Sequence, residues 1–273
     1  MFAAMRVLQI IPAALTAALL SAPAVAQGIA DVVNARILPG WRMEDGRHMA
    51  AVRLALEPGW KTYWRAPGDA GIPPQIVWSG GGNVRGIEAH WPVPVVFWQN
   101  GMRSVGYKGE VVVPIEIASE RAGEDIHLDA RLDIGVCEDI CVPVSLELSG
   151  VLPASGAAPN PVIRAALANR PMTADEAGVG RVVCATEPIS DGIRVTVSVD
   201  MPRHFPEEET VVELADRSVW ISEPETRRDG GRLVTAAEMV PPDAKPFAMA
   251  RSDVRVTVLG GGQAVDIRGC TGS

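Results

Sequence analysis

Short runs of alternating apolar and polar residues dominate the chain from about residue 47 to residue 150. The clearest run, residues 127–134, reads His-Leu-Asp-Ala-Arg-Leu-Asp-Ile, and turn-forming clusters such as PGDAGIPP, SGGGN, QNG and YKGE separate the runs. A period of two places alternate side chains on opposite faces of a strand. Many short strands divided by turn residues are typical of an all-β sandwich. The strands predicted in this half are 47–58, 61–64, 74–79, 84–92, 93–98, 110–118, 125–136 and 143–152.

The β pattern resumes at residue 181 after a break. The break begins with PASGAAPNP, which has linker composition, and continues with residues 162–173, whose helical spacing ends at Pro171 and predicts one short surface helix. Later strands are predicted at 181–189, 192–201, 210–215, 218–222, 232–240, 253–261 and 264–270. The sequence therefore predicts two β-sandwich domains, 27–152 and a smaller 181–273, joined by a linker with one helix over 153–180.

The first 26 residues have the pattern of a cleaved export signal. Arg6 is followed by an apolar run from Val7 to about Leu20 and then by Ala24-Val25-Ala26, an A-x-A cleavage site. The alternative is a membrane anchor, but the run is shorter than the roughly 20 residues that a span needs. We expect cleavage after Ala26 and export to an oxidising compartment.

Charge and hydropathy narrow the classes of partner. The formal net charge is −8, slightly more negative once Arg6 is removed, and no basic stripe is visible. This argues against nucleic acid or anionic lipid as a partner. No later stretch approaches 18 apolar residues, so we expect no membrane insertion after signal cleavage.

Two cysteines lie unusually close together within an alternating stretch. Cys137 and Cys141 occur in DIGVCEDICVPV. A straight strand would hold residues i and i+4 about 13 Å apart, whereas a disulfide needs Cα atoms within roughly 7 Å. Residues 138–140, Glu-Asp-Ile, must therefore reverse the chain if the two cysteines bond, which Glu and Asp tolerate.

Three roles for the Cys137/Cys141 pair compete. They are a structural disulfide, a Cu(I) clip, since thiolates favour Cu(I), and a thiol–disulfide couple. For copper, the nearest histidine candidates, His127 and His204, have no obvious placement. So small a ring would add little stability and would be easy to reduce, which favours the redox couple. Neither cysteine has a basic neighbour in sequence, and Glu138 and Asp139 disfavour a thiolate, so we expect a sluggish nucleophile that depends on its partner.

The other two cysteines, Cys184 and Cys270, lie in the first and last predicted strands of the second domain. Joining them would close a long loop, which the chain-entropy model values at about 4 kcal/mol. We predict a structural disulfide here, with two free or functional thiols as the alternative.

Residues 59–152 resemble the N-terminal periplasmic domain of the thiol:disulfide interchange reductases, the DsbD family, and most closely its copper-tolerance-linked, ScsB-like branch. The resemblance lies in PGWKTYWRAPGDAGIPPQIVW, HWPVPVVFWQNGMRSVGYKGEVVVPIEIA and LDARLDIGVCEDICVPVSLEL, which keep the family's order. It implies an immunoglobulin-like domain with protein-disulfide reductase-like activity and no cofactor. The implied partners are thioredoxin-like proteins, a membrane electron carrier and oxidised periplasmic proteins.

The resemblance also implies roles for individual residues. Cys141 would exchange with partners and Cys137 would resolve the mixed disulfide. A cap loop would fall at residues 97–101, with Phe97 and Trp98, while Tyr63, Trp64 and Asp69 would flank the pair; ordinary packing is the alternative for all five.

Two departures from the family pattern stand out. Three residues separate the cysteines instead of five, as in the copper-tolerance branch. The chain also ends at Ser273 without a membrane carrier or a thioredoxin-like domain, so we expect donor and acceptor to be other proteins. The alternative function is a periplasmic copper-binding module, or an interaction module of a redox or cytochrome-maturation assembly, without catalytic exchange.

Overall fold

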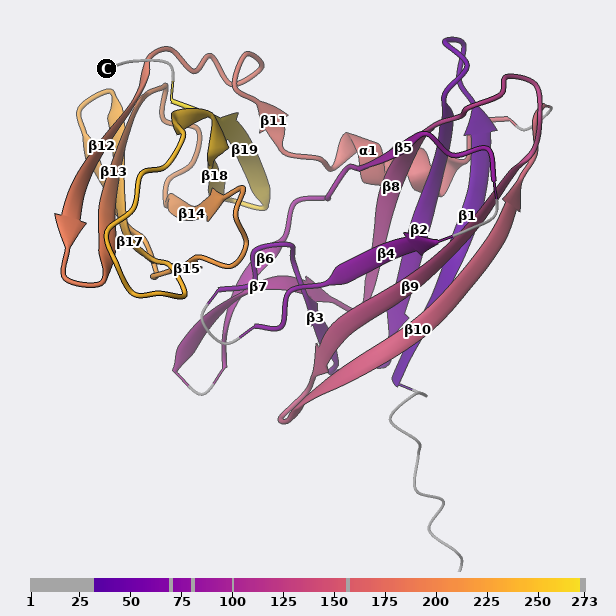
Figure 1. Cartoon of the computed structure of the whole chain (residues 1–273), viewed down its shortest axis with the longest axis horizontal. Coiled ribbons are helices and arrows are strands. Elements are labelled where there is room, and N and C mark those ends of the chain that lie inside the picture. Colours follow the sequence, from indigo (N-terminus) through magenta and orange to yellow (C-terminus); the bar gives the residue numbers. More distant parts are fainter. Residues whose placement is uncertain (1–31, 69–70, 80–81, 100, 156–157, 271–273) are drawn as a thin grey trace, which may run out of the picture.

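The computed structural model describes residues 32–68, 71–79, 82–99, 101–155 and 158–270 (Figure 1). The predicted export signal and Asp69 lie outside these residues. Within them, no helix has the length and apolar character needed to cross a membrane.

The first half of the chain folds into two sheets that face each other. One has the order β1-β2-β8-β5, and the other has the order β10-β9-β3-β7-β6, with β4 also paired to β9. The strands are β1 (Val33–Arg42), β2 (His48–Leu56), β3 (Lys61–Tyr63), β4 (Gln75–Ser79), β5 (Gly86–Ala89), β6 (Val95–Gln99), β7 (Met102–Lys108), β8 (Glu110–Ala118), β9 (Ile126–Cys137) and β10 (Cys141–Leu152).

The second half forms two further sheets, in the orders β11-β19-β18-β14 and β12-β13-β17-β15, with β16 paired to β17. Its elements are β11 (Met172–Thr173), β12 (Val182–Ile189), β13 (Gly192–Asp200), β14 (Glu209–Leu214), β15 (Trp220–Ile221), β16 (Glu225–Asp229), β17 (Arg232–Val240), the 3₁₀ turn η2 (Arg251–Asp253), β18 (Val254–Gly260) and β19 (Gln263–Arg268). The predicted all-β fold is confirmed.

Strand β9 shows how the sequence pattern builds the core. Its even-numbered residues from Ile126 to Val136 are at most 2% exposed and pack between the two sheets. Its odd-numbered residues from His127 to Asp133 face outward and are exposed or half-buried. Alternation with a period of two thus separates a core face from a solvent face, and it puts Cys137 on the outward face.

A short helix, α1 (Pro161–Ala168), follows the first two sheets. The Asn160 side chain accepts hydrogen bonds from the backbone N–H groups of Val162 and Ile163 and so caps the first turn. Ile163 is fully buried against Met49 and Val112 of the first half, while Val162 is 44% exposed. The predicted helix is present, although it ends at Ala168, and Ile163 lies on its packed face.

The two halves lie side by side, with the second half next to β6 and β7 (Figure 1). The Arg65 guanidinium, 3% exposed, donates to the Glu213 carboxylate at 2.9 Å. Arg103 of β7 donates to Glu209 at 2.9 Å and to the Thr210 carbonyl at 3.3 Å. A buried charge is costly unless it is paired, so these arginines make the contact specific.

The sequence pattern missed three strands of regular length: β1, β7 and β16. In β1 the pairing with β2 is interrupted between Leu38 and Trp41, where Pro39 and Gly40 resemble a turn. Strand β7 follows the turn residues QNG and contains Gly106. Strand β16 is polar throughout and pairs only with β17. In β1 the alternation runs only from Val33 to Ile37 before this turn-like pair, and β7 and β16 lack a regular alternation of apolar and polar residues.

Candidate functional site

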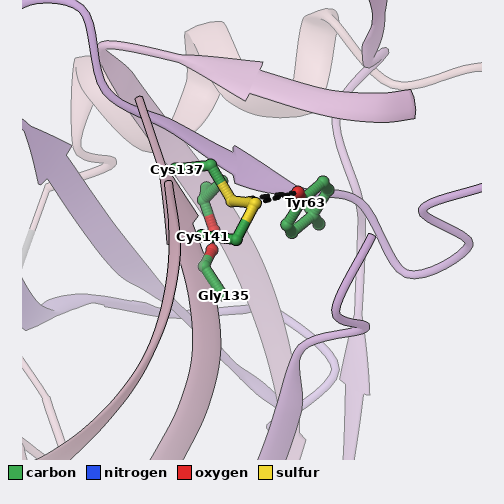
Figure 2. The surroundings of a disulfide bond; sticks show 5 residues. Tyr63, Gly135, Cys137 and Cys141 are labelled. Carbon is green, nitrogen blue, oxygen red and sulfur yellow. Dashed lines mark hydrogen bonds between the residues drawn. A yellow bond between two sulfur atoms is a disulfide. The ribbon is translucent and has the colours of Figure 1, made fainter. Parts of the chain in front are cut away.

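The cysteine pair closes the hairpin between β9 and β10. Cys137 and Cys141 are directly opposite each other in the antiparallel register, with Cα atoms 4.1 Å apart, and they form a disulfide. The reversal consists of residues 138–140, and the Glu138 N–H lies 3.4 Å from the Ile140 carbonyl oxygen. Figure 2 shows the bond spanning the two strands at this tip.

The two cysteines differ sharply in exposure. Cys137 lies on the outward face of β9, yet it is fully buried because aromatic side chains cover that part of the sheet. Cys141, one strand further out, is exposed, and its neighbour Ile140 is 75% exposed. A disulfide exchanges when a thiolate reaches one of its sulfurs. Access from solvent therefore favours Cys141.

Tyr63 of β3 binds both sulfurs through its hydroxyl group (Figure 2). Its oxygen lies 2.9 Å from the Cys137 Sγ and 3.1 Å from the Cys141 Sγ. Disulfide sulfurs carry no proton, so the tyrosine is the donor. Burial raises the pKa of Tyr63 above its usual value, which keeps the hydroxyl protonated and able to donate near neutral pH.

Gly135 makes room for the Tyr63 ring. A Cβ atom added at this glycine would lie 2.7 Å from the Ile72 Cβ and 3.0 Å from the Tyr63 Cε2. The strand beside the ring is fixed by Thr62, whose hydroxyl donates to the Gly135 carbonyl at 2.9 Å. The absence of a side chain two residues before Cys137 therefore allows the tyrosine to reach the sulfurs.

Phe97 of β6 completes the cover over Cys137. It is 6% exposed, packs in one cluster with Tyr63 and Cys137, and stacks on Tyr63 with ring centroids 6.5 Å apart. Trp98 points to the opposite face of β6 and is 62% exposed. Trp64 is fully buried in the core, with the Arg65 guanidinium 3.8 Å from its ring centroid. Among the aromatic residues predicted from the sequence, the structure thus places Tyr63 and Phe97, but neither tryptophan, at the disulfide.

Two lysines that are distant from the cysteines in sequence lie near the disulfide. Lys61 is paired with Cys137 across β3 and β9, and with Lys108 across β3 and β7. Their ammonium groups lie 5.5 Å and 5.8 Å from the centroid of the Phe97 ring. No basic residue is adjacent to the cysteines in sequence. Strand pairing nevertheless brings in Lys61 and Lys108, which are 76 and 29 residues before Cys137.

Neither candidate copper-binding histidine is placed beside the cysteines. His127 is ten residues from Cys137 along β9, about 33 Å at strand spacing. The His204 ring nitrogen Nε2 lies 2.8 Å from the Ala177 carbonyl oxygen in the second half. Across the residues that the structure describes, no group of three or more His, Cys, Asp or Glu side chains could hold a metal ion.

The second disulfide joins Cys184 in β12 to Cys270, two residues after the end of β19. The Cα atoms are 5.7 Å apart, and 86 positions separate the two residues in sequence. The bond links the end of the described chain to the start of the second half, far in sequence from the first disulfide.

Comparison with known proteins gives a family match for the segment that contains the Cys137–Cys141 disulfide. Residues 34–153 match the family model described as "Thiol:disulfide interchange protein DsbD, N-terminal", and the resemblance expected from the sequence is confirmed for this segment. No curated protein matches the chain in sequence.

Solved structures show the fold of the larger part of the chain. The N-terminal periplasmic domain of ScsB from Proteus mirabilis superposes with a TM-score of 0.61 at 22% identity, covering 88% of this chain and 92% of that one. The immunoglobulin-like fold expected from the resemblance is thereby confirmed. The C-terminal domain of the AgI/II polypeptide BspA from Streptococcus agalactiae, 8% identical, reaches a TM-score of only 0.17, too low to indicate a shared fold.

Proposed function

We propose that the chain is a periplasmic thiol–disulfide exchange protein that relays electrons through Cys137 and Cys141. The electrons come from thioredoxin-like proteins or a membrane electron carrier and pass to oxidised periplasmic proteins. Cys141 is the sulfur that exchanges with partners, and Cys137 resolves the mixed disulfide. The match of residues 34–153 to an interchange-protein family supports this class of reaction.

One observation carries the assignment of roles. A single disulfide joins a fully buried sulfur, that of Cys137, to an exposed cysteine, Cys141, and the hydroxyl of Tyr63 donates to both. A purely structural bond needs neither the exposed partner nor the donor. An exchanging bond uses both, because one sulfur must be reached and the other must leave as a thiolate.

The exchange takes place in two balanced steps. A partner thiolate attacks the Cys141 sulfur, the Cys137–Cys141 bond breaks, and Cys137 leaves as a thiolate while the partner sulfur bonds to Cys141. The partner's second thiolate then attacks its own sulfur in this mixed disulfide and releases Cys141 as a thiolate. The partner is oxidised by two electrons, the pair is reduced by two, and each released thiolate is protonated from solvent according to its pKa.

The reverse sequence delivers the electrons. The Cys141 thiolate attacks an oxidised protein's disulfide, and Cys137 resolves the mixed disulfide. Tyr63, held at 2.9 Å from the Cys137 sulfur, stabilises the buried thiolate in both directions, since a hydrogen bond to a charged acceptor is stronger than one to a neutral acceptor. Export by residues 1–26 would place the chain in the periplasm.

Trapping the mixed disulfide tests the proposal. A reduced thioredoxin-like protein whose second active-site cysteine is replaced by serine, so that it cannot release itself from the complex, is mixed with each single-cysteine variant. The remaining cysteine of each variant carries a small thiol in disulfide linkage. Cys137→Ser, which keeps the exposed Cys141, should exchange rapidly and accumulate a covalent complex on a non-reducing gel. Cys141→Ser, which keeps only the buried Cys137, should react at least tenfold more slowly.

The matched control is the double variant Cys184→Ser/Cys270→Ser, which should exchange like the original chain. Equal rates for Cys137→Ser and Cys141→Ser would contradict the assigned roles. A reduction potential for the Cys137–Cys141 pair well below about −300 mV would mark an inert structural bond and would overturn the relay itself.

A further inference from the structure

Lysine is rare in this chain, and its placement is selective. The sequence has three lysines, Lys61, Lys108 and Lys245, against 22 arginines. Two of the three lie on paired positions of neighbouring strands near the disulfide, while arginine forms ion pairs with carboxylates elsewhere in the described residues. This distribution points to a local requirement for an ammonium group.

The two lysines and the two cysteines form one continuous row across four strands. Lys108 of β7 is opposite Lys61 of β3, Lys61 is opposite Cys137 of β9, and Cys137 is opposite Cys141 of β10. Directly paired residues in antiparallel strands place their side chains on the same face, with Cβ atoms about 4.5–5.5 Å apart. The stem of Lys61 therefore begins next to the side chain of Cys137.

The lysine side chains extend over the cover of the disulfide. Both ammonium groups lie within 6 Å of the Phe97 ring centroid, and Phe97 itself packs against Cys137. Lys61 is half-buried and Lys108 is exposed. Lys61, the lysine whose strand position is paired with Cys137, is thus the less exposed of the two, and a charge that is less exposed to water acts more strongly on its neighbours.

Other charged and titratable groups belong to the same neighbourhood. Tyr63 follows Lys61 on the same face of β3, and Glu138 and Asp139 form the reversal beside Cys137. The Glu138 carboxylate lies over the turn before β3, since a Cβ at Gly59 would be 2.6 Å from its Oε1. The two carboxylates oppose a thiolate, and the two ammonium groups favour one.

We infer that Lys61, assisted by Lys108, is a positioning residue that stabilises the Cys137 thiolate each time the disulfide opens. This inference deepens the proposed function and rests on it. Cys137 is fully buried, so opening the bond creates a negative charge in apolar surroundings, which is costly without a nearby positive charge. Tyr63 supplies a hydrogen bond to that sulfur, and Lys61 supplies the compensating charge.

The residue type is consistent with this role. Lysine presents a compact point charge on a flexible stem, whereas arginine presents a planar fork suited to paired acceptors. A single sulfur anion has no planar pair of acceptors. A rival role is also visible: the ammonium groups could simply hold the Phe97 ring in place by cation–π attraction.

Measuring the pKa of Cys137 separates the inference from the proposed function. The Cys141→Ser variant leaves Cys137 as the single free thiol, and its titration is followed by the carbon-13 shift of its Cβ atom, which requires no partner protein. In this background Lys61→Met should raise the pKa of Cys137 by about one unit, a tenfold loss of thiolate below that pKa. Lys61→Arg should keep the pKa of Cys137 close to its original value, and Lys108→Met should raise that pKa by less than Lys61→Met does.

Two controls sharpen the titration. Lys245→Met, which removes the remaining lysine, should leave the pKa of Cys137 unchanged. Glu138→Gln should lower it, because it removes an opposing charge. An unchanged or lowered pKa in Lys61→Met would overturn the inference, even if the exchange reaction itself is established.

The rival role predicts a change of opposite sign in a second assay. With both cysteines present, Lys61→Met should slow reduction of the Cys137–Cys141 bond by dithiothreitol several-fold, because a leaving thiol of higher pKa leaves more slowly. If the lysines only hold Phe97 over the bond, the same variant should be reduced faster. Faster reduction would therefore replace the electrostatic role with a covering role.

Discussion

The hydroxyl group of Tyr63 provides the most direct test of the site. Tyr63→Phe removes one oxygen and keeps the ring, which is 2% exposed and stacked on Phe97. The lost oxygen lies 2.9 Å from the Cys137 sulfur and 3.1 Å from the Cys141 sulfur. The variant therefore tests the hydrogen bond with little change in packing.

The magnitude follows from the charge of the acceptor. A hydrogen bond to a charged group is worth about 1.5–3 kcal/mol, and a disulfide sulfur is only a weak acceptor. Tyr63→Phe should therefore destabilise the Cys137 thiolate more than the disulfide and raise the pKa of Cys137 by about 1–2 units. The reduction potential should fall by roughly 30–60 mV above that pKa. At lower pH both thiols are protonated, and the difference should shrink.

The assay is equilibration of the pair against a glutathione buffer over a range of pH. The chain has two tyrosines, so the second provides a matched control. Tyr107 is buried on the core side of β7, and its hydroxyl donates to the Pro92 carbonyl at 2.9 Å. Tyr107→Phe should change the free energy of unfolding and leave the reduction potential unaltered.

Two results would refute this reasoning. If Tyr63→Phe has the potential of the original chain throughout the pH range, the hydroxyl does not stabilise the thiolate. If Tyr63→Phe and Tyr107→Phe shift the potential equally, the effect comes from general loosening of the sheet.

Three further substitutions test other parts of the structure. Phe97→Ala uncovers Cys137 and should speed reduction by dithiothreitol at least several-fold, while Trp98→Ala, on the opposite face, should not; equal rates would remove Phe97 from the site. Gly135→Ala should lower the free energy of unfolding by about 1–3 kcal/mol through overpacking against Tyr63. Gly86→Ala, whose added Cβ would have no atom within 4 Å, should cause no such loss, and thermal unfolding of both variants checks this. Cys184→Ser/Cys270→Ser should lower the free energy of unfolding in urea by about 4 kcal/mol with the exchange rate preserved, and an unchanged midpoint would contradict a stabilising role.

The sequence predicted the fold class and the reversal at residues 138–140 because both depend on local patterns. Alternation along β9 reveals its core face, and the distance between Cys137 and Cys141 in a straight strand requires a turn if they bond. The structure forms that turn with Glu138 and Ile140 at its ends. Both results follow from neighbouring residues alone.

The surroundings of the disulfide could not be read in the same way. Tyr63, Phe97 and Lys61 come together around the disulfide only because β3 pairs with both β7 and β9, a register that no local pattern specifies. The resemblance indicated Tyr63 and Phe97 together with their neighbours Trp64 and Trp98. Strand alternation then separates each pair, because adjacent residues point to opposite faces.

Under the proposed exchange, the unequal exposure of the two cysteines also prevents a partner from remaining covalently bound. In the proposed exchange a partner attacks the exposed Cys141, so the sulfur expelled is that of Cys137 inside the same chain. That sulfur cannot diffuse away and stays on the strand opposite the new bond. In each mixed disulfide, Cys137 can attack the Cys141 sulfur again and expel the partner. A partner that lacks a second thiol is therefore released unchanged.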